Sequence, residues 1–293
     1  DAIIAIGGGS AMDGGKLICL TANNDIPLRD FEFELTPPKI SKDNPFPKII
    51  TIPTTAGTGA ETEITAMVTY LKEGMKFCMW HPDARPVLAL VDPKLTLGLP
   101  PSLTAWTGVD AMVHAIEGYC VPGFNPLCDG SAIESLSLIS KSLYLAVEEP
   151  KNLVARGGMH VGSYLGGVAF LKGLGLVHAI SHMVGAEFNT QHGLTNAIIL
   201  PVVLRYNLSG MDEKVKRMSE AMQFEDHSID AFITNIEKML DRLNIPKSLS
   251  EIGVPEDCFE RIAKKAMKDQ AYATNPKIAT LEEVKEMTLA SIK

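Results

Sequence analysis

The chain has 293 residues, more than a typical small domain, which indicates one to two domains. Its formal net charge of −8 excludes the basic stripe that nucleic acids and anionic membranes require, so we predict neither as a partner. No apolar run reaches the roughly 18 residues of a membrane-spanning helix. Five scattered cysteines without CxxC pairs favour a reduced, cytoplasmic setting.

The first hundred residues alternate apolar runs with turns rich in glycine and proline. A Gly-Gly-Gly-Ser turn and a helix ending near residue 21 follow the first run. Strands are expected over 2–6, 48–52, 63–70, 75–80 and 86–91, the third and fourth forming a hairpin. Because the chain opens within a strand, without an initiator methionine or a signal peptide, we expect further sequence upstream.

From about residue 101 the pattern is helical and predicts no strands. Helices are expected near 102–120, 127–148, 151–171, 195–209, 228–243 and 256–269. The simplest division is an α/β domain over 1–100, followed by an all-helical domain over 101–293.

Asp110 and His114 are the first candidate metal ligands. They lie four residues apart in an expected helix, so both side chains share one face. His178 and His192 are fourteen residues apart, about 21 Å along one helix, so the chain must fold back between them. The positions that tolerate such a break are Gly185, Asn189 and Gly193. Carboxylate and imidazole suit divalent transition metals, and the spacing predicts one shared site.

Other polar residues of this region have weaker cases. Each histidine of the cluster would by itself more often be an ordinary helix residue than a ligand. His81, His160 and His227 have no such company and are interpreted as structural or surface residues. Glu117 is either an outer partner of the site or a solvated helix carboxylate, the second being favoured.

Two loops follow predicted strands in the α/β part. The turn at 7–10 joins a strand to a helix, where backbone N–H groups and the helix dipole hold a pyrophosphate. Met12 stands where the GxGxxG fingerprint needs its third glycine. The segment 53–61 offers three threonine hydroxyls and glycines that admit a close backbone. Either loop by itself could be an ordinary polar turn. Two such loops at the ends of neighbouring strands, however, favour a crevice that binds a nucleotide.

Five motifs in chain order carry a family resemblance. They are Gly-Gly-Gly-Ser-x-x-Asp-x-x-Lys (7–16), Pro-Thr-Thr-Ala-Gly-Thr-Gly (53–59), Asp-Pro-x-Leu-Thr-Leu-x-Leu-Pro-Pro (92–101), Gly-Val-Asp-Ala-x-x-His-Ala-x-Glu (108–117) and Gly-Leu-Val-His-Ala-x-Ser-His (175–182). A His-Gly pair trails the last motif at 192–193. Together they resemble the iron-containing alcohol dehydrogenases over essentially the whole chain.

The resemblance implies a Rossmann-like dinucleotide-binding α/β domain followed by an all-helical metal-binding domain, with the active site between them. It implies a metal held by Asp110, His114, His178 and His192. His182 would be the catalytic residue, lying beside the nicotinamide and the reacting oxygen. The metal would be Fe²⁺, with Zn²⁺ as the alternative, because the ligand set suits both.

The resemblance also implies contacts to NAD or NADP. Those residues are Gly8, Gly9, Ser10, Thr54, Thr55, Thr58, Thr65, Lys76, Leu95 and His182. The glycines and Ser10 would face the pyrophosphate, Lys76 a ribose and Leu95 the adenine side, while Thr65 is the weakest assignment. By its position in the motif, Asp13 would lie near the cleft between the domains, or it would only cap the helix start.

Several positions depart from the family pattern. Ala60 replaces a serine, Met183 stands where proline commonly follows the second histidine, and Gln191 replaces a frequent proline. The fold-back before His192 is therefore less enforced than usual, and we expect Gly185 to carry more of it. Relatives also carry about ninety residues upstream that select between NAD and NADP, so the resemblance implies either cofactor.

The resemblance implies an oxidoreductase that interconverts an alcohol and an aldehyde or ketone by metal-assisted hydride transfer to or from NAD(P). The alternatives are a polyol or hydroxyacid dehydrogenase of the same superfamily, a dehydroquinate-synthase-like lyase, and a non-catalytic metal-binding helical module. A small alcohol or aldehyde is the expected partner. Homo-oligomers are a further expectation, because strand 2–6 leaves an apolar sheet edge.

Overall fold

The computed structural model describes residues 2–293, and it begins with a small parallel sheet. β1 (Ala2–Gly7) leads through α1 (Gly9–Thr21) to β2 (Lys48–Pro53), and β5 (Leu88–Ala89) pairs with β2 on the other side. The sheet order is β1-β2-β5, and β1, α1 and β2 form a βαβ crossover unit. α1 lies close on one face because Gly15 has no side chain; a Cβ there would stand 2.6 Å from the Ala5 Cβ.

The predicted hairpin is confirmed. β3 (Thr65–Tyr70) and β4 (Met75–Trp80) pair antiparallel in a sheet of their own, with Thr65 opposite Trp80. Gly74 turns the chain with a φ of 57°, a conformation that favours glycine. The strand expected at 86–91 is much shorter, because only Leu88 and Ala89 pair with β2.

The helical part begins at α2. Its helices are α2 (Pro101–Cys120), α3 (Pro126–Glu148), α4 (Leu153–Ala169), α5 (Leu176–Phe188), α6 (His192–Asn207), α7 (Asp212–Ala221), α8 (Ile229–Arg242), α9 (Phe259–Ala266), α10 (Gln270–Ala273) and α11 (Leu281–Ile292). Short 3₁₀ turns lie at Leu28–Phe31, Ala60–Thr62, Pro82–Ala84, Pro93–Thr96, Phe170–Lys172, Leu249–Ile252 and Glu256–Cys258. Within residues 2–293, every strand precedes α2, which confirms the predicted fold class.

Four helices lie outside the predicted helical segments: α5, α7, α10 and α11. α5 is buried on every side from Leu176 to Val184, so it lacks the alternation of apolar and polar faces that marks a surface helix. α11 does carry a local signal, a capping box in which Thr280 and Glu283 exchange hydrogen bonds with each other's backbone.

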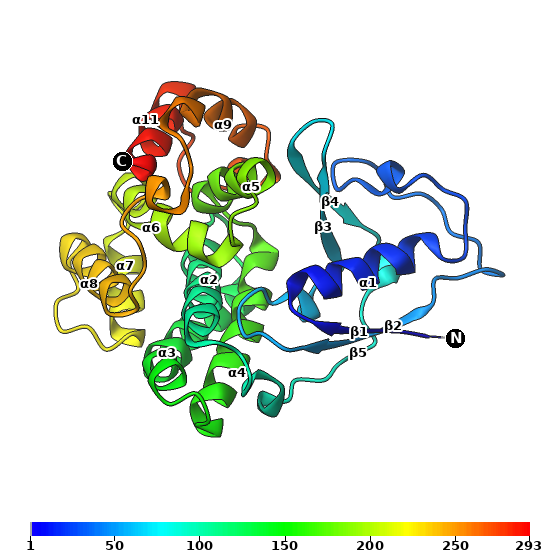
Figure 1. The fold of residues 1–293 in the computed structure, drawn as a ribbon, viewed down its shortest axis with the longest axis horizontal. Helices are drawn as coiled ribbons and strands as arrows, with labels where there is room; N and C mark the ends of the chain where they lie inside the picture. Colours follow the sequence, from blue (N-terminus) through cyan, green and yellow to red (C-terminus); the bar gives the residue numbers. More distant parts are fainter. Residues whose placement is uncertain (1) are drawn as a thin grey trace.

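α2 is the central helix of the molecule. Every residue from Thr107 to Cys120 is buried, and α3, α4 and α6 pack around the helix. Figure 1 shows α2 between the helical bundle and the part that holds the two sheets. Polar side chains on such a helix have no access to bulk water, so each needs a partner inside the protein.

Among residues 2–293 no single helix is long and apolar enough to cross a bilayer, although the bent pair Leu153–Lys172 and Leu176–Phe188 passes that test when joined.

Candidate metal centre

One face of α2 carries the first two predicted ligands. Asp110 and His114 are separated by one helical turn and are 2% and 4% exposed. The His114 Nε2 lies 4.0 Å from Asp110 Oδ1. A carboxylate and an imidazole therefore lie close together with almost no exposure to solvent.

The fold-back between the other two ligands lies at Asn189. α5 ends at Phe188, Asn189 adopts the left-handed conformation with φ 53°, and α6 begins with His192. Asparagine is one of the few residues that tolerate this conformation. The prediction that Gly185 carries the break is wrong, because Gly185 lies inside α5.

The four predicted ligands converge. Ligand atoms of Asp110, His114, His178 and His192 all lie within 4.8 Å of one another. The rings are also neighbours: the centroids of His114 and His178 are 4.7 Å apart, and those of His178 and His192 are 5.3 Å apart. Side chains 82 positions apart in sequence, from 110 to 192, thus meet around one point.

Hydrogen bonds orient two of the imidazoles for metal binding. The Nδ1 of His114 lies 3.2 Å from the Gly57 carbonyl oxygen, and the Nδ1 of His178 lies 2.7 Å from Glu117 Oε2. Both partners only accept, so each Nδ1 carries the hydrogen and each Nε2 keeps its lone pair. These lone pairs suit a divalent cation, and the donor set of three imidazoles and one carboxylate fits one.

Burial favours the uncharged form of two of the imidazoles, those of His114 and His192. It lowers the pKa of His114 to about 4, and it lowers the pKa of His192 well below the ordinary value, with the Lys76 ammonium adding to the effect. Neutral imidazole is the form that binds a metal, so these two side chains need no deprotonation near neutral pH.

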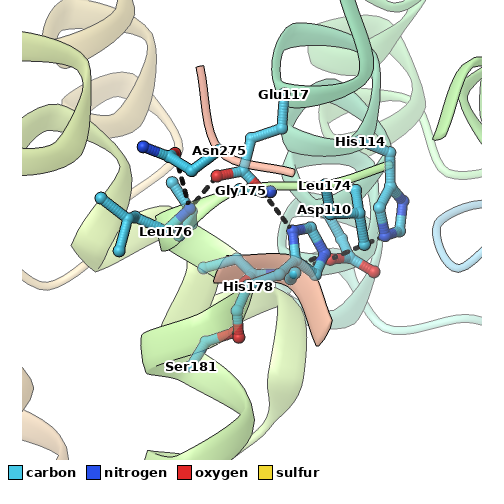
Figure 2. Close-up of polar contacts among 12 residues, drawn as sticks. Asp110, His114, Glu117, Leu174, Gly175, Leu176, His178, Ser181 and Asn275 are labelled. Carbon is cyan, nitrogen blue, oxygen red and sulfur yellow. Dashed lines mark hydrogen bonds and ion pairs between the residues drawn. The ribbon is translucent and has the colours of Figure 1, made fainter. Parts of the chain in front are cut away.

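Glu117 lies one turn beyond His114, facing the start of α5 (Figure 2). It is 4% exposed, so the favoured interpretation as a solvated carboxylate is wrong. Its oxygens accept hydrogen bonds from the backbone N–H groups of Gly175 (3.1 Å) and Val177 (2.8 Å) as well as from His178. Glu117 therefore caps α5 from another helix and holds the His178 ring, two tasks that fix this ligand in place.

His182 lies beside the cluster and has a partner that sequence reasoning missed. Its ring stacks on His192 with the centroids 5.4 Å apart, and its Nδ1 is 2.9 Å from Asp269 Oδ2. Asp269 is 7% exposed, and its other oxygen accepts from the Ala271 N–H at 2.8 Å. The carboxylate accepts from Nδ1, which leaves the Nε2 of His182 free of hydrogen.

The structure brings the two predicted dinucleotide loops together. The Thr54 N–H donates to the Gly7 carbonyl at 2.8 Å. A Cβ on Gly8 would stand 3.4 Å from Thr55 Cγ2, and one on Gly9 only 2.7 Å from Thr58 Cγ2, so this packing requires glycine. Within residues 2–293 the buried Thr55 hydroxyl has no hydrogen-bond partner, so it is available to a bound group.

The remaining predicted cofactor residues are more scattered. The Thr65 hydroxyl donates to Glu63, while Ser10 and Leu95 are exposed. Burial lowers the pKa of Lys76, and the carboxylates of Asp13, Asp110 and Asp269 oppose that effect, which places the ammonium among these acids.

Asp13 does not cap α1. The N-cap is Gly8, and no side chain bonds to the amides of the first turn. Asp13 instead accepts from the Met67 backbone, and burial raises its pKa to about 6.

Comparison with known families identifies the chain. Residues 1–93 match the profile described as "Iron-containing alcohol dehydrogenase", and residues 104–292 match "Fe-containing alcohol dehydrogenase family, C-terminal". The chain belongs to the iron-containing alcohol dehydrogenase family. The resemblance inferred from the five motifs is confirmed.

Individual members of the family are similar over nearly the whole chain. An NAD-dependent methanol dehydrogenase of Bacillus methanolicus is 35% identical, over 98% of this chain and 76% of the relative. A lactaldehyde reductase of Escherichia coli (strain K12) is 37% identical, over 98% and 76%. The crystal structure of a 1,3-propanediol oxidoreductase superposes with a TM-score of 0.93 at 33% identity, over 100% of this chain and 77% of that one.

Proposed function

We propose that this protein interconverts an alcohol and an aldehyde or ketone by metal-assisted hydride transfer to or from NAD(P). The observation that carries the proposal is the convergence of one carboxylate and three imidazoles within 4.8 Å, on helices from three parts of the chain. Membership of the family and the names of its relatives, which act on alcohols and aldehydes, support the same reaction.

The proposed metal ligands are Asp110, His114, His178 and His192. Four protein ligands leave a position open for substrate on an ion that expands beyond four-coordination, as catalysis needs. The ion we propose is Fe²⁺, with Zn²⁺ as the alternative, and when bound it would supply a Lewis acid beside the reacting oxygen. The chain's own contribution is to hold neutral imidazoles in place: Glu117 orients His178, and the Gly57 carbonyl orients His114.

We propose that residues 1–100 contribute to dinucleotide binding and 101–293 form the metal-binding unit. The proposed contacts are Gly8, Gly9, Ser10, Thr54, Thr55, Thr58, Thr65, Lys76, Leu95 and His182. Two observations support a pyrophosphate site here: the Thr55 hydroxyl has no partner within residues 2–293, and the two loops pack closely at Gly9 and Thr58. NAD is the preferred cofactor, because one similar relative is named NAD-dependent, and NADP is the alternative.

His182 is the proposed catalytic residue. Its Nε2 takes the hydroxyl proton during alcohol oxidation and returns it during carbonyl reduction. Asp269 holds the ring by accepting from Nδ1, and it stabilises the imidazolium that forms when Nε2 takes the proton. The proton therefore moves at Nε2 while the Nδ1–H stays bonded to the carboxylate.

The proposed substrate is a small alcohol or aldehyde, and polyols and hydroxyacids remain the alternatives within the superfamily. Relatives named for methanol and for lactaldehyde support a small substrate. We further propose a cytoplasmic enzyme, in keeping with five free, buried cysteines, and a homo-oligomer.

The test is absorbance at 340 nm after the purified protein is mixed with an alcohol, NAD⁺ and Fe²⁺ or Zn²⁺. A panel of simple alcohols, diols and hydroxyacids separates the substrate classes. His192→Ala should lose most of the bound metal by elemental analysis, whereas His182→Ala should keep the metal and lose turnover. Equal metal loss in the two variants would contradict the role of His182, and no signal with any substrate would leave the non-catalytic module as the better explanation.

A further inference from the structure

We propose that Asn196 is a positioning residue of the cation site, and that its carboxamide holds three of the four ligands in place while no ion is bound. The inference rests on the metal site proposed above. The Asn196 Nδ2 lies 2.7 Å from Asp110 Oδ1, 3.2 Å from His178 Nε2 and 3.2 Å from His192 Nε2. One amide group thus contacts ligands from α2, α5 and α6.

The orientation of the carboxamide follows from its neighbours. Two of the contacting atoms are acceptors, since Asp110 offers a carboxylate and His178 presents the Nε2 lone pair left by its bond to Glu117. The Nε2 of His192 is an acceptor in the tautomer that carries its hydrogen on Nδ1. The two hydrogens on Nδ2 serve these acceptors, one toward Asp110 and one shared between the rings. The reverse orientation would set the amide oxygen against the carboxylate. In the present orientation the buried Asn196 Oδ1 has no partner within residues 2–293, so the contacts of Nδ2 decide the position of the group.

Asn196 reaches the site because α6 lies very close to α2. His192 is the first residue of α6, and Asn196 follows one turn later on the same face. A Cβ on Gly193 would stand 2.3 Å from the Trp106 carbonyl oxygen and 3.0 Å from the Asp110 Cβ. Asn196 is 0% exposed, and within residues 2–293 its N–H groups contact only Asp110, His178 and His192.

The distances show that the amide lies beside the ion's place. Ligands about 2.1 Å from one tetrahedral ion are about 3.4 Å from one another. The Nδ2 lies at 2.7 to 3.2 Å from three ligand atoms, which is a ligand-to-ligand spacing and longer than a metal bond. A bound ion would take the two imidazole lone pairs, and the amide would keep its bond to Asp110.

Two consequences follow for the protein. Without the amide, a buried carboxylate and bare imidazole lone pairs face one another with no donor between them, and in the metal-free protein they separate. With the amide, the ligands are held close to the arrangement that an ion needs, so metal binding requires less reorganisation of the protein. Loss of a residue that positions a ligand typically weakens metal binding by about 10- to 100-fold.

The first experiment measures Co²⁺ binding by visible absorbance on the chain after EDTA treatment. Asn196→Leu, which keeps the size and loses the donor, should raise the dissociation constant about 10- to 100-fold. The control is Thr288→Val in α11, because Thr288 is also buried but its hydroxyl donates to the Val284 carbonyl instead of a ligand. The control should bind Co²⁺ as wild type does. Wild-type affinity in Asn196→Leu, or an equal loss in both variants, would overturn the proposal.

The second experiment needs no metal. In EDTA, the shifts in melting temperature caused by Asn196→Leu and Asp110→Ala should be non-additive, because the two side chains are partners. Thr288→Val and Asp110→Ala should be additive. Additivity in the first pair would overturn the proposal even if Co²⁺ binds. If the wild-type chain takes up no Co²⁺, the metal assignment fails, and this cycle still decides the role of Asn196.

Asn196→Asp is a second variant that keeps the shape of the side chain. It removes both N–H donors and adds a carboxylate next to Asp110, so the metal-free protein should melt below wild type. Co²⁺ should raise its melting temperature more than it raises that of wild type, because the ion neutralises the added charge. A metal-free protein as stable as wild type would contradict the donor role of the amide.

Discussion

His160 is a buried side chain that makes no hydrogen bond to the described part of the chain. It is 1% exposed, and neither ring nitrogen has a hydrogen-bond partner within residues 2–293. Burial lowers its pKa to about 4, with the carboxylate of Asp92 opposing the effect. An imidazole in the unfolded chain titrates near 6.5, so between pH 6.5 and pH 4 the unfolded state binds more protons than the folded state. Acidification through this window therefore destabilises the protein.

His160→Leu should stabilise the protein. At pH 7 the gain is about 1 to 3 kcal/mol in the free energy of unfolding, because an unpaired buried polar ring is replaced by an apolar side chain. The gain should grow as the pH falls from 6.5 to 4, since the variant lacks the group that takes up the proton. Urea unfolding at several pH values measures both effects. His227→Leu is the control and should not stabilise, because His227 bonds to the Phe224 carbonyl at 3.1 Å. A variant less stable than wild type at pH 5 would contradict this account.

At the scale of elements, the site depends on how closely α6 packs against α2. Gly193 makes that approach possible, and it brings both His192 and Asn196 to the face of α2 that carries Asp110. The other fixed contact is at the start of α5, which Glu117 and Asn275 cap from distant parts of the chain. The ligands therefore depend on helix ends and helix contacts more than on the loops between them.

Gly193→Ala tests this packing. The added methyl group would lie 2.3 Å from the Trp106 carbonyl oxygen, so α6 must move away and carry its ligands from Asp110. We expect a loss of about 1 to 3 kcal/mol in unfolding free energy and about a tenfold loss in metal affinity. Gly157→Ala in α4, where nothing lies within 4 Å of the added group, should instead stabilise by about 0.5 to 1 kcal/mol and leave metal binding unchanged. Equal unfolding free energies by calorimetry and equal metal affinities by titration in the two variants would show that α6 does not pack tightly against α2.

At the scale of the whole molecule, the parallel sheet has one covered and one open face. α1 covers the face that holds Ala5 and Ile49, while Ile4 and Ile6 point away from it and are 63% and 57% exposed. Val87 directly precedes β5 and donates its N–H to the Ile49 carbonyl, and its side chain is 60% exposed. The proposed self-association would cover these apolar residues.

Light scattering should therefore give a mass above the 31.7 kDa of one chain, rising with protein concentration. Ile6→Lys should shift the protein toward the monomer, because it places a charge on the open face. Ile278→Lys is the matched control: Ile278 is 93% exposed but lies in the helical part, so its substitution should leave the mass unchanged. A monomer at every concentration would contradict self-association through the sheet.

Much of the fold was predictable from local pattern. The βαβ unit at β1, α1 and β2 and the β3–β4 hairpin follow from apolar runs and glycine turns, which act over a few residues. α5 escaped prediction because it is buried all round, and the fold-back was assigned to Gly185 although Asn189 adopts the left-handed conformation. Burial and backbone conformation at such positions depend on neighbours that are distant in sequence.

The sequence by itself determined which residue types could ligate a metal and that Asp110 and His114 share one face, because helical spacing is local. The sequence also predicted His178 and His192 as ligands, but it did not show how close these two residues lie to Asp110 and His114. Only the tertiary structure decided that Glu117 is buried, that Asp269 holds His182, and that the Asn196 amide bonds the ligands. These partners lie on separate helices, and a hydrogen bond between side chains distant along the chain leaves no periodic trace in either segment.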